Sequence, residues 1–375
     1  MDHSLSTEQQ FFADTIRRFM ESKCPISRVR QIADGASGFD DRLWKEFTDL
    51  GWSSLLAEEA YGGAALGPES YVYLGIVAEE SGRLIQPGPV HSTVIASAVL
   101  SLPGNEQLKQ QYLPGIISGS CITAWAASNA TGDRAKKESS VEATPSSEGF
   151  HVRGNSFCVE AAPLADLFLV STHMDGEPAH FLVPASTPGV TVVPQSGLDI
   201  TRRYGTVHFD CEVASTAQIQ QLDDKATGKL QALALTLQAL DSAGAMQRVF
   251  EFTLEWAFDR YSFGRPLASY QALKHRYADM KVEVEACQAT AWASLHAIAN
   301  FDPNAAQLSR VANAYVSLSA PEVVQDCIQM HGGIGVTWEH DIHLYLRRVT
   351  ANSALYGNHR QHKEAIALVI LEEAS

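Results

Sequence analysis

Apolar residues recur at helical spacing through the first part of the chain. Four of them share one helix face: Phe12, Ile16, Phe19 and Met20. Ser6 and Gln9 precede this face as a capping box, in which each side chain bonds the other residue's backbone amide. Similar spacing returns over residues 43–50 and 72–83. The pattern predicts a helical domain over residues 1–119.

Residues 120–222 contain short runs rich in β-branched and aromatic residues. The runs cover 150–152, 167–170, 179–183 and 190–193, and Gly, Pro, Ser and Asp separate them. Their spacing of about ten residues predicts an antiparallel sandwich or barrel. The polar stretch 139–149 predicts a turn.

Helical patterns return in residues 223–375. They cover 230–260, 273–298 and 305–330, and a last one covers 365–373. Gly244 lowers the helix propensity inside the first of them. Helices, then strands, then helices predict an α+β protein with an all-β domain between two helical domains.

The composition excludes several classes of partner. The chain has 375 residues, with 28 Lys and Arg against 43 Asp and Glu, a net charge of −15. Nucleic acid and anionic membranes would repel it, so we expect neither as a partner. No apolar run approaches the ~18 residues that span a bilayer. The absence of a secretory signal and the six scattered cysteines predict reduced thiols in the cytoplasm.

Familiar catalytic and metal motifs are missing. The 13 histidines include no HExxH pair, and no cysteine or carboxylate cluster completes a ligand set, so we expect no metal. No GxSxG sequence indicates a serine hydrolase. The glycine run at 332–335 lacks the third glycine of a dinucleotide fingerprint and follows a helical pattern. It predicts a helix end, where glycines also let a backbone approach a ligand.

The segment 259–280 has two interpretations. Arg260, Phe263 and Gln271 place a guanidinium, an aromatic ring and an amide close together in sequence. Such a set can bind a planar cofactor that carries phosphate. Alternatively, the segment is a turn between two helices with an arginine ion pair.

A series of motifs, in order, resembles the flavin-dependent acyl-CoA dehydrogenase family over essentially the whole chain. They are Leu50-Gly51-Trp52, Tyr61-Gly62-Gly63, Glu79-Glu80-Ser81-Gly82-Arg83, Gln111-Tyr112-Leu113-Pro114, Arg260-x-x-Phe263-Gly264-x-Pro266-Leu267, Gln271-x-x-x-His275-x-x-Ala278-Asp279-Met280 and Gln329-x-His331-Gly332-Gly333-Ile334-Gly335. The resemblance implies a helical domain, a β domain and a four-helix bundle. It also implies α,β-desaturation of an acyl-CoA with FAD as cofactor and an electron-transferring flavoprotein as acceptor.

The chain departs from the family where the flavin ring would be held. The family's Thr-Glu-Pro and Gly-Ser-Asp runs align with 126–128 and 131–133, which read Ala-Ala-Ser and Thr-Gly-Asp. Hydroxyl groups are therefore missing at Ala126 and Gly132. Cys158 and Glu160 stand where the family has a Trp and a Thr, and Glu160 would bring an unpaired charge to the ring.

The expected catalytic base is missing as well. The position of the family's usual catalytic Glu holds Tyr356, whose phenol is a poor base with a pKa of about 10. Some members carry the base on the long helix, at a position that matches Ala234. Asp241 lies two helical turns further on, roughly on the same face, and is the fallback candidate.

The family residues that contact the adenosine diphosphate half of FAD are present: Arg260, Phe263, Gln271, Gln329, Gly332 and Gly333. The resemblance therefore implies a complementary subunit, which clasps the FAD tail for a homologous partner that holds the ring and the Glu. An α2β2 assembly and a bulky or steroid-derived acyl-CoA would follow. Two alternatives stay open: a self-sufficient homomeric dehydrogenase or oxidase that uses Asp241, and a flavin-free structural or regulatory subunit.

Overall fold

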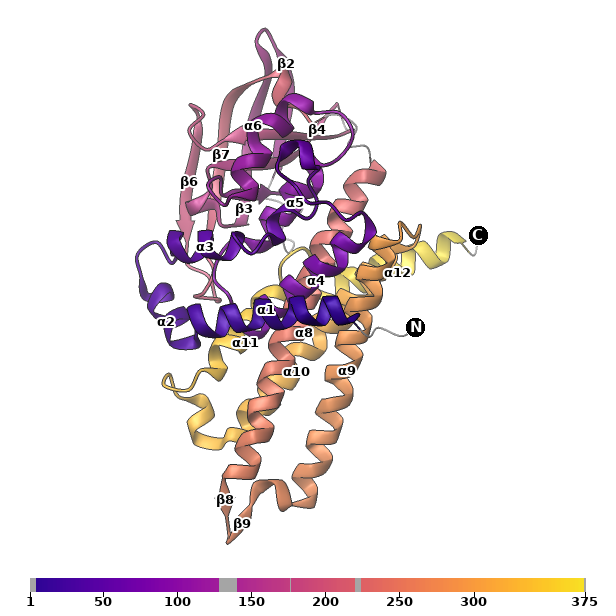
Figure 1. The fold of residues 1–375 in the computed structure, drawn as a ribbon. Helices are drawn as coiled ribbons and strands as arrows, with labels where there is room; N and C mark the ends of the chain where they lie inside the picture. The colour runs from indigo at the N-terminus through magenta and orange to yellow at the C-terminus, as the bar shows by residue number, and fades with distance from the viewer. Residues whose placement is uncertain (1–4, 128–139, 176, 220–223, 374–375) are drawn as a thin grey trace.

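A helical layer opens the chain in the computed structural model, which describes residues 5–127, 140–175, 177–219 and 224–373 (Figure 1). Its helices are α1 (Thr7–Lys23), α2 (Ile26–Asp34), α3 (Asp41–Thr48), α4 (Pro68–Arg83), α5 (Val90–Leu100) and α6 (Glu106–Ile117). The capping box is confirmed: the amide of Gln9 donates to Ser6 Oγ at 3.2 Å, and the amide of Ser6 donates to Gln9 Oε1 at 2.9 Å.

The central strands form one seven-stranded sheet. They are β1 (Thr123–Ala126), β2 (Ser140–Ser146), β3 (Gly149–Glu160), β4 (Leu167–Met174), β5 (Glu177–Pro184), β6 (Val190–Gln195) and β7 (Tyr204–Ala214). The order is β1-β4-β2-β3-β7-β6, and β5 pairs with β4. Most pairs are antiparallel, as the strand spacing predicted, whereas β4 runs parallel to β1 and touches β2 in a parallel bridge.

The turn predicted for 139–149 is wrong over most of its length. Residues 140–146 form β2, which pairs with β3 along its full length. Val141 and Ala143 are buried between exposed neighbours, so two small apolar residues suffice to give the strand its inner face.

The last region is a helical bundle. It consists of α8 (Asp224–Asp259), α9 (Gln271–Ala299), α10 (Ala305–His331), α11 (Ile342–Asn352) and α12 (His359–Glu373). The short strands β8 (Tyr261–Ser262) and β9 (Arg265–Pro266) form a hairpin between α8 and α9, at the end of the bundle opposite the sheet (Figure 1).

Two glycines let α4 and α8 touch backbone to backbone. A Cβ atom at Gly82 would lie 1.8 Å from the carbonyl oxygen of Asp241, and one at Gly244 would lie 2.0 Å from that of Glu79. Gly244 therefore serves close helix packing, which offsets its low helix propensity. The contact fixes α8, and with it Asp241, against the N-terminal layer.

Candidate functional site

The six residues predicted to contact a cofactor tail, here called the clasp, lie at one end of the bundle. They are Arg260, Phe263, Gln271, Gln329, Gly332 and Gly333. Arg260 directly follows α8, Gln271 begins α9, and Gln329 lies in the last turn of α10. Since α8 and α10 end where α9 begins, residues far apart in the sequence reach the same end (Figure 1).

The clasp side chains face solvent. Phe263 is 98% exposed, and Arg260, Gln271 and Gln329 are exposed too. Within the described part of the chain, none of these three polar side chains makes a hydrogen bond or ion pair. The guanidinium carbon of Arg260 lies 5.9 Å from the ring centre of Trp256. These polar groups are therefore free to bind another molecule.

The hairpin holds Phe263 outward. Phe263 and Gly264 have φ angles of 49° and 81°, which make the tight turn between β8 and β9. Tyr270 supports the turn because its hydroxyl donates to the carbonyl of Ser262 at 2.7 Å. The guanidinium carbon of Arg265 lies 3.9 Å from the Tyr270 ring centre. The sequence analysis missed this support.

The glycines of the clasp border open space. α10 ends at His331, and Gly332 adopts a φ of 65° as its C-cap. A Cβ atom added at Gly332 or Gly333 would meet nothing within 4 Å. The small size of Gly333 is therefore not required by packing within this chain, and both glycines leave room for a ligand against the backbone.

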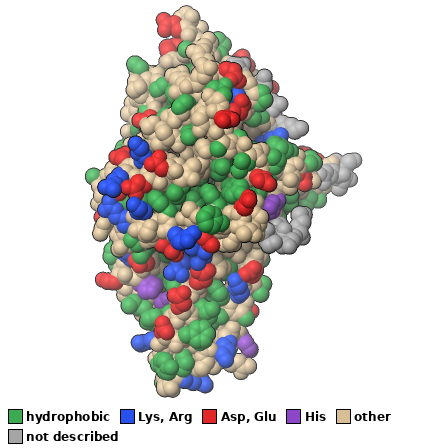
Figure 2. All heavy atoms as spheres, in the orientation of Figure 1, with side chains coloured by type: hydrophobic (Ala, Val, Ile, Leu, Met, Phe, Trp, Pro, Cys, Tyr) green, Lys and Arg blue, Asp and Glu red, His purple; other side chains and the backbone are tan. Residues whose placement is uncertain are grey.

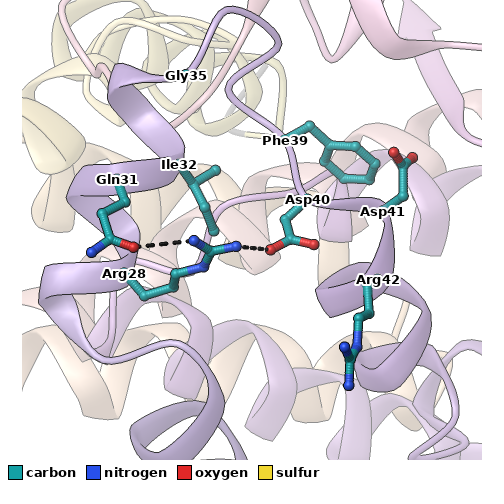
Figure 3. A pocket seen from close by; sticks show the side chains of 8 residues that line it. All are labelled: Arg28, Gln31, Ile32, Gly35, Phe39, Asp40, Asp41 and Arg42. Atoms are coloured by element: carbon teal, nitrogen blue, oxygen red, sulfur yellow. Dashed lines mark hydrogen bonds and ion pairs between the residues drawn. The ribbon is translucent and has the colours of Figure 1, made fainter.

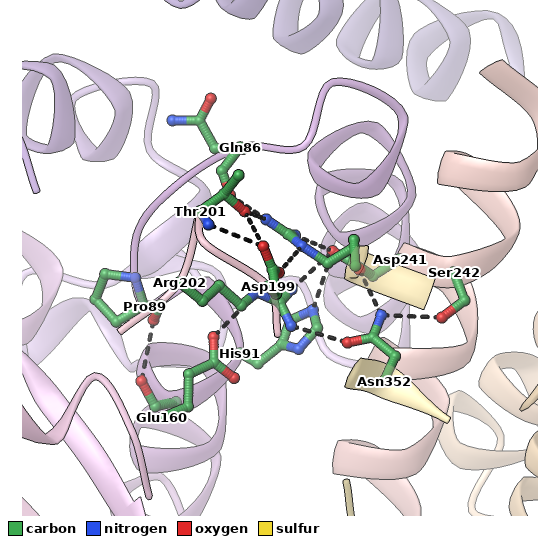
Figure 4. Close-up of polar contacts among 12 residues, drawn as sticks. Gln86, Pro89, His91, Glu160, Asp199, Thr201, Arg202, Asp241, Ser242 and Asn352 are labelled. Atoms are coloured by element: carbon green, nitrogen blue, oxygen red, sulfur yellow. Dashed lines mark hydrogen bonds and ion pairs between the residues drawn. The ribbon is translucent and has the colours of Figure 1, made fainter. Parts of the chain in front are cut away.

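A second group of residues, here called the junction cluster, is buried where the three domains meet (Figure 4). It consists of Glu160, Asp199, Arg202, Asp241, Arg348 and Asn352. Arg348 donates to Asp199 at 2.6 Å and to Asp241 at 3.0 Å. Arg202 donates to Asp241 at 2.9 Å and to Asn352 at 3.0 Å. The cluster links the end of the β domain to α8 and α11.

Glu160 is not the unpaired charge that the sequence analysis expected. It ends β3 and is 8% exposed, with Oε1 lying 3.3 Å from Nε of Arg202. Burial raises the pKa of Glu160, and Arg202 opposes that shift. The ion-pair partner of Glu160, Arg202, belongs to no recognisable sequence motif and lies after β6 in the sequence.

Asp241 is completely buried and saturated with donors. Besides the two arginines, the amide nitrogen of Asn352 donates to its Oδ1 at 2.7 Å. Burial alone would raise the pKa of Asp241, but Arg202 and Arg348 outweigh it and lower the pKa to about 2. A general base near neutral pH needs the opposite shift. The contacts are those of a structural counterion.

Tyr356, which the resemblance aligns with the family's catalytic Glu, packs against an aromatic residue of the β domain. The ring of Tyr356 lies 5.4 Å from the ring of Trp125, and burial raises the pKa of its phenol. Trp125 in turn donates to Ser171 Oγ at 2.8 Å. Ala126 is buried and apolar, as expected for a lost hydroxyl. The predicted cradle positions 128 and 131–133, with Gly132, lie outside the described residues.

Cys158 occupies a bulge near the end of β3. The register between β3 and β7 shifts between Ser156 and Val159, and Cys158 has a φ of 53°. Its amide donates to Gln195 Oε1 at 3.2 Å. The bulge is therefore tied to β6, and a thiol stands where the family's Trp would pack.

A shallow hollow between α2 and α3 offers little binding chemistry (Figure 3). It has a volume of about 460 Å³. Its Arg28 already donates to Gln31 at 3.1 Å and to Asp40 at 2.5 Å. Its other arginine, Arg42, pairs with Glu46 at 2.9 Å, so both guanidinium groups of the hollow already have partners.

Within residues 5–127, 140–175, 177–219 and 224–373, no group of three or more His, Cys, Asp or Glu is arranged to hold a metal ion. Across the same ranges, no helix is both long enough and apolar enough to cross a membrane.

Comparison with known proteins identifies the class of protein. The chain belongs to the acyl-CoA dehydrogenase family: residues 6–120 match the N-terminal domain and residues 234–371 match the C-terminal domain. It is therefore an acyl-CoA dehydrogenase, an oxidoreductase whose cofactor is FAD.

Individual relatives cover nearly the whole chain. Acyl-CoA dehydrogenase IpdE2 of Mycolicibacterium smegmatis is 28% identical over 358 residues, 95% of this chain and 97% of that protein. A variant of the Tcur3481-Tcur3483 steroid ACAD has a TM-score of 0.87 at 26% identity, covering 98% of both chains. The ChsE4-ChsE5 complex from Mycobacterium tuberculosis has a TM-score of 0.89 at 24% identity, covering 99% of both chains.

Proposed function

We propose that this chain is one half of a composite acyl-CoA dehydrogenase. It contributes the clasp to the adenosine diphosphate half of FAD, and a homologous partner holds the flavin ring and supplies the catalytic Glu. One observation carries the proposal: the clasp is exposed and free of partners, whereas the junction cluster satisfies its own charges inside the chain.

The clasp fits a dinucleotide tail. Arg260 offers a fixed fork of donors for a pyrophosphate, and the amides of Gln271 and Gln329 can bond ribose or base. Phe263 offers a flat apolar face, and the backbone at Gly332 is open to close approach. When bound, FAD accepts the hydride in the desaturation of the acyl thioester. This chain's part is to hold the tail.

The residues at the junction do not fit a flavin ring or a working base. Arg202 and Glu160 form an ion pair there, and Tyr356 packs on Trp125. Opening this region would leave buried charges without partners, which is strongly destabilising. We therefore assign no proton transfer to Asp241 or Tyr356 and place the reacting carboxylate in the partner.

The proposal extends to the assembly and the substrate class. The Tcur3481-Tcur3483 protein is named a steroid ACAD, and ChsE4-ChsE5 is named as a complex. These names favour a bulky or steroid-derived acyl-CoA and an α2β2 assembly for this chain. An electron-transferring flavoprotein would then reoxidise the flavin.

Co-expression tests the proposal. The chain is purified alone and together with a homologue from the same genome. That homologue carries the family's Thr-Glu-Pro run, the Trp and Thr that Cys158 and Glu160 replace here, and the catalytic Glu. We expect a colourless single chain and a yellow complex that desaturates acyl-CoA. A yellow homomer whose turnover collapses in Asp241→Asn would establish the self-sufficient enzyme instead. A colourless complex would favour a flavin-free subunit.

A further inference from the structure

A pocket distinct from the clasp opens between the N-terminal helices and the C-terminal half of α8. Its volume is about 560 Å³, a size that suits a small organic ligand. Its walls come from the α1–α2 junction, from α8, from the end of α10 and from the segment 339–345. No clasp residue lines it, and the proposed function does not use it.

Aromatic rings form the inner wall of this pocket. They are Phe252, Trp256, His331, His340 and Tyr345. The ring centre of His331 lies 5.4 Å from that of Trp256, 5.7 Å from that of Phe252 and 4.6 Å from that of His340. Arg248 already lies over Phe252, with its guanidinium carbon 5.7 Å from the ring centre. The electron-rich faces of such rings attract cations.

The pocket is strongly acidic. Its carboxylates are Glu21, Glu255, Asp259, Glu339 and Asp341. Arg248 is the lining's single Lys or Arg. Outside the lining, Arg30 pairs with Asp341 at 2.6 Å, and the Arg260 guanidinium carbon lies 5.9 Å from the ring centre of Trp256. Burial lowers the pKa of His331 and of His340, so both rings are neutral near pH 7. A phosphate would be repelled and a cation attracted.

The polar atoms of the wall include an unsatisfied donor. Trp256 Nε1 is buried and has no acceptor among the described residues. His331 Nδ1 lies 2.8 Å from the carbonyl of Cys327, so it carries the ring proton and leaves Nε2 as an acceptor. A buried donor without an acceptor destabilises a fold. Because Nε1 has no contact with solvent, the recognition argued here rests on the rings and the carboxylates and not on this donor.

We propose that this pocket binds an organic cation with a compact apolar body. The aromatic wall takes the apolar body, and the carboxylates balance the charge. A small alkylammonium ion has this chemistry, and so does a lysine side chain on a neighbouring polypeptide.

Calorimetric titration of the full chain with two isosteres tests the charge requirement. Choline and 3,3-dimethylbutan-1-ol share shape and hydroxyl group and differ in the positive charge. We expect saturable choline binding that is about tenfold tighter than binding of the neutral alcohol. Saturation by Nα-acetyl-lysine amide but not by choline would support the same chemistry with a polypeptide source. Equal binding of both isosteres, no binding of either cation, or displacement of choline by ADP would overturn the proposal.

Substitutions in the pocket lining test whether choline binds there. Trp256→Leu should abolish choline binding, whereas Trp256→Phe keeps an aromatic ring and should weaken it less. The double variant Glu255→Gln and Glu339→Gln, at exposed positions, should weaken it several-fold and reduce its salt dependence. Trp338→Leu is the matched control, since Trp338 is 54% exposed and does not line the pocket. Choline binding that survives both Trp256→Leu and the double variant would contradict the assignment.

Discussion

The junction cluster and the clasp both use arginine, in opposite ways. Arg202 and Arg348 are buried, and each bonds two partners or more within the chain. Arg260 is exposed and lies over Trp256 without a carboxylate partner in the described residues. An arginine with internal partners stabilises its own fold, whereas one without them is available to another molecule. The same residue type therefore separates a structural region from the proposed binding region.

The largest effect on the free energy of unfolding is expected from replacing Arg348 of the junction cluster. Arg348→Met removes one guanidinium from between two buried aspartates and should lower the free energy of unfolding by about 3–5 kcal/mol. Urea denaturation of the isolated chain measures it. Arg347→Met is the control: Arg347 is only partly buried, so its loss should cost far less. Equal losses for both variants would show that the cluster does not stabilise the fold.

Replacing Arg260 should affect binding and not folding. Arg260→Ala removes charge-assisted hydrogen bonds worth about 1.5–3 kcal/mol, so the complex with its partner should lose FAD roughly ten- to a hundredfold more readily. Flavin absorbance after ultrafiltration measures the retained cofactor. Arg265→Ala is the neighbouring control, because the Arg265 guanidinium already packs on Tyr270. Unchanged FAD retention in Arg260→Ala would remove Arg260 from the clasp.

Acid should weaken the junction before it alters the clasp. The folded pKa of Asp241, about 2, lies below the reference value of 3.8. Its carboxylate therefore stabilises the fold above pH 3.8, by roughly 2 kcal/mol, and this contribution is lost as the pH falls toward 2. Unfolding free energies between pH 5 and pH 2 should fall more steeply for the wild type than for Asp241→Asn. Parallel curves would contradict the assigned ionisation.

The smallest effect on stability is expected at the tip of the hairpin. Phe263 is 98% exposed, so Phe263→Ser should change the free energy of unfolding of the isolated chain by less than about 0.5 kcal/mol. The same variant should still lower FAD retention in the complex. Thermal unfolding and flavin absorbance, measured side by side, check the two outcomes. A strongly destabilised variant would mean that Phe263 packs within the chain.

Local sequence patterns were enough to predict the long helices and to locate the motifs of the proposed clasp. Apolar spacing predicted the long helices that became α8, α9 and α10, because each helix buries a continuous face. The clasp motifs are short, and their positions at helix ends follow from the order of the helices. The strand β2 was missed because only Val141 and Ala143 mark its inner face.

The sequence could not predict contacts between segments that lie far apart in the chain. Glu160 finds Arg202 only when β3 and the segment before β7 converge, and Tyr356 meets Trp125 across most of the chain. No sequence motif or regular spacing predicts either contact. The sequence therefore indicated that a charge at 160 needed explaining, and only the three-dimensional arrangement supplied its partner.

The interlocking of Glu160, Arg202 and Asp241 also bears on how this chain can evolve. Restoring a glutamate at Tyr356 would bring another acid close to Glu160, and removing Glu160 would leave Arg202 with Asp241 as its remaining carboxylate partner. Each single step toward an independent catalyst thus costs stability before it returns any activity. Under the proposed division of labour between subunits, an independent catalyst would need several coordinated substitutions in this chain.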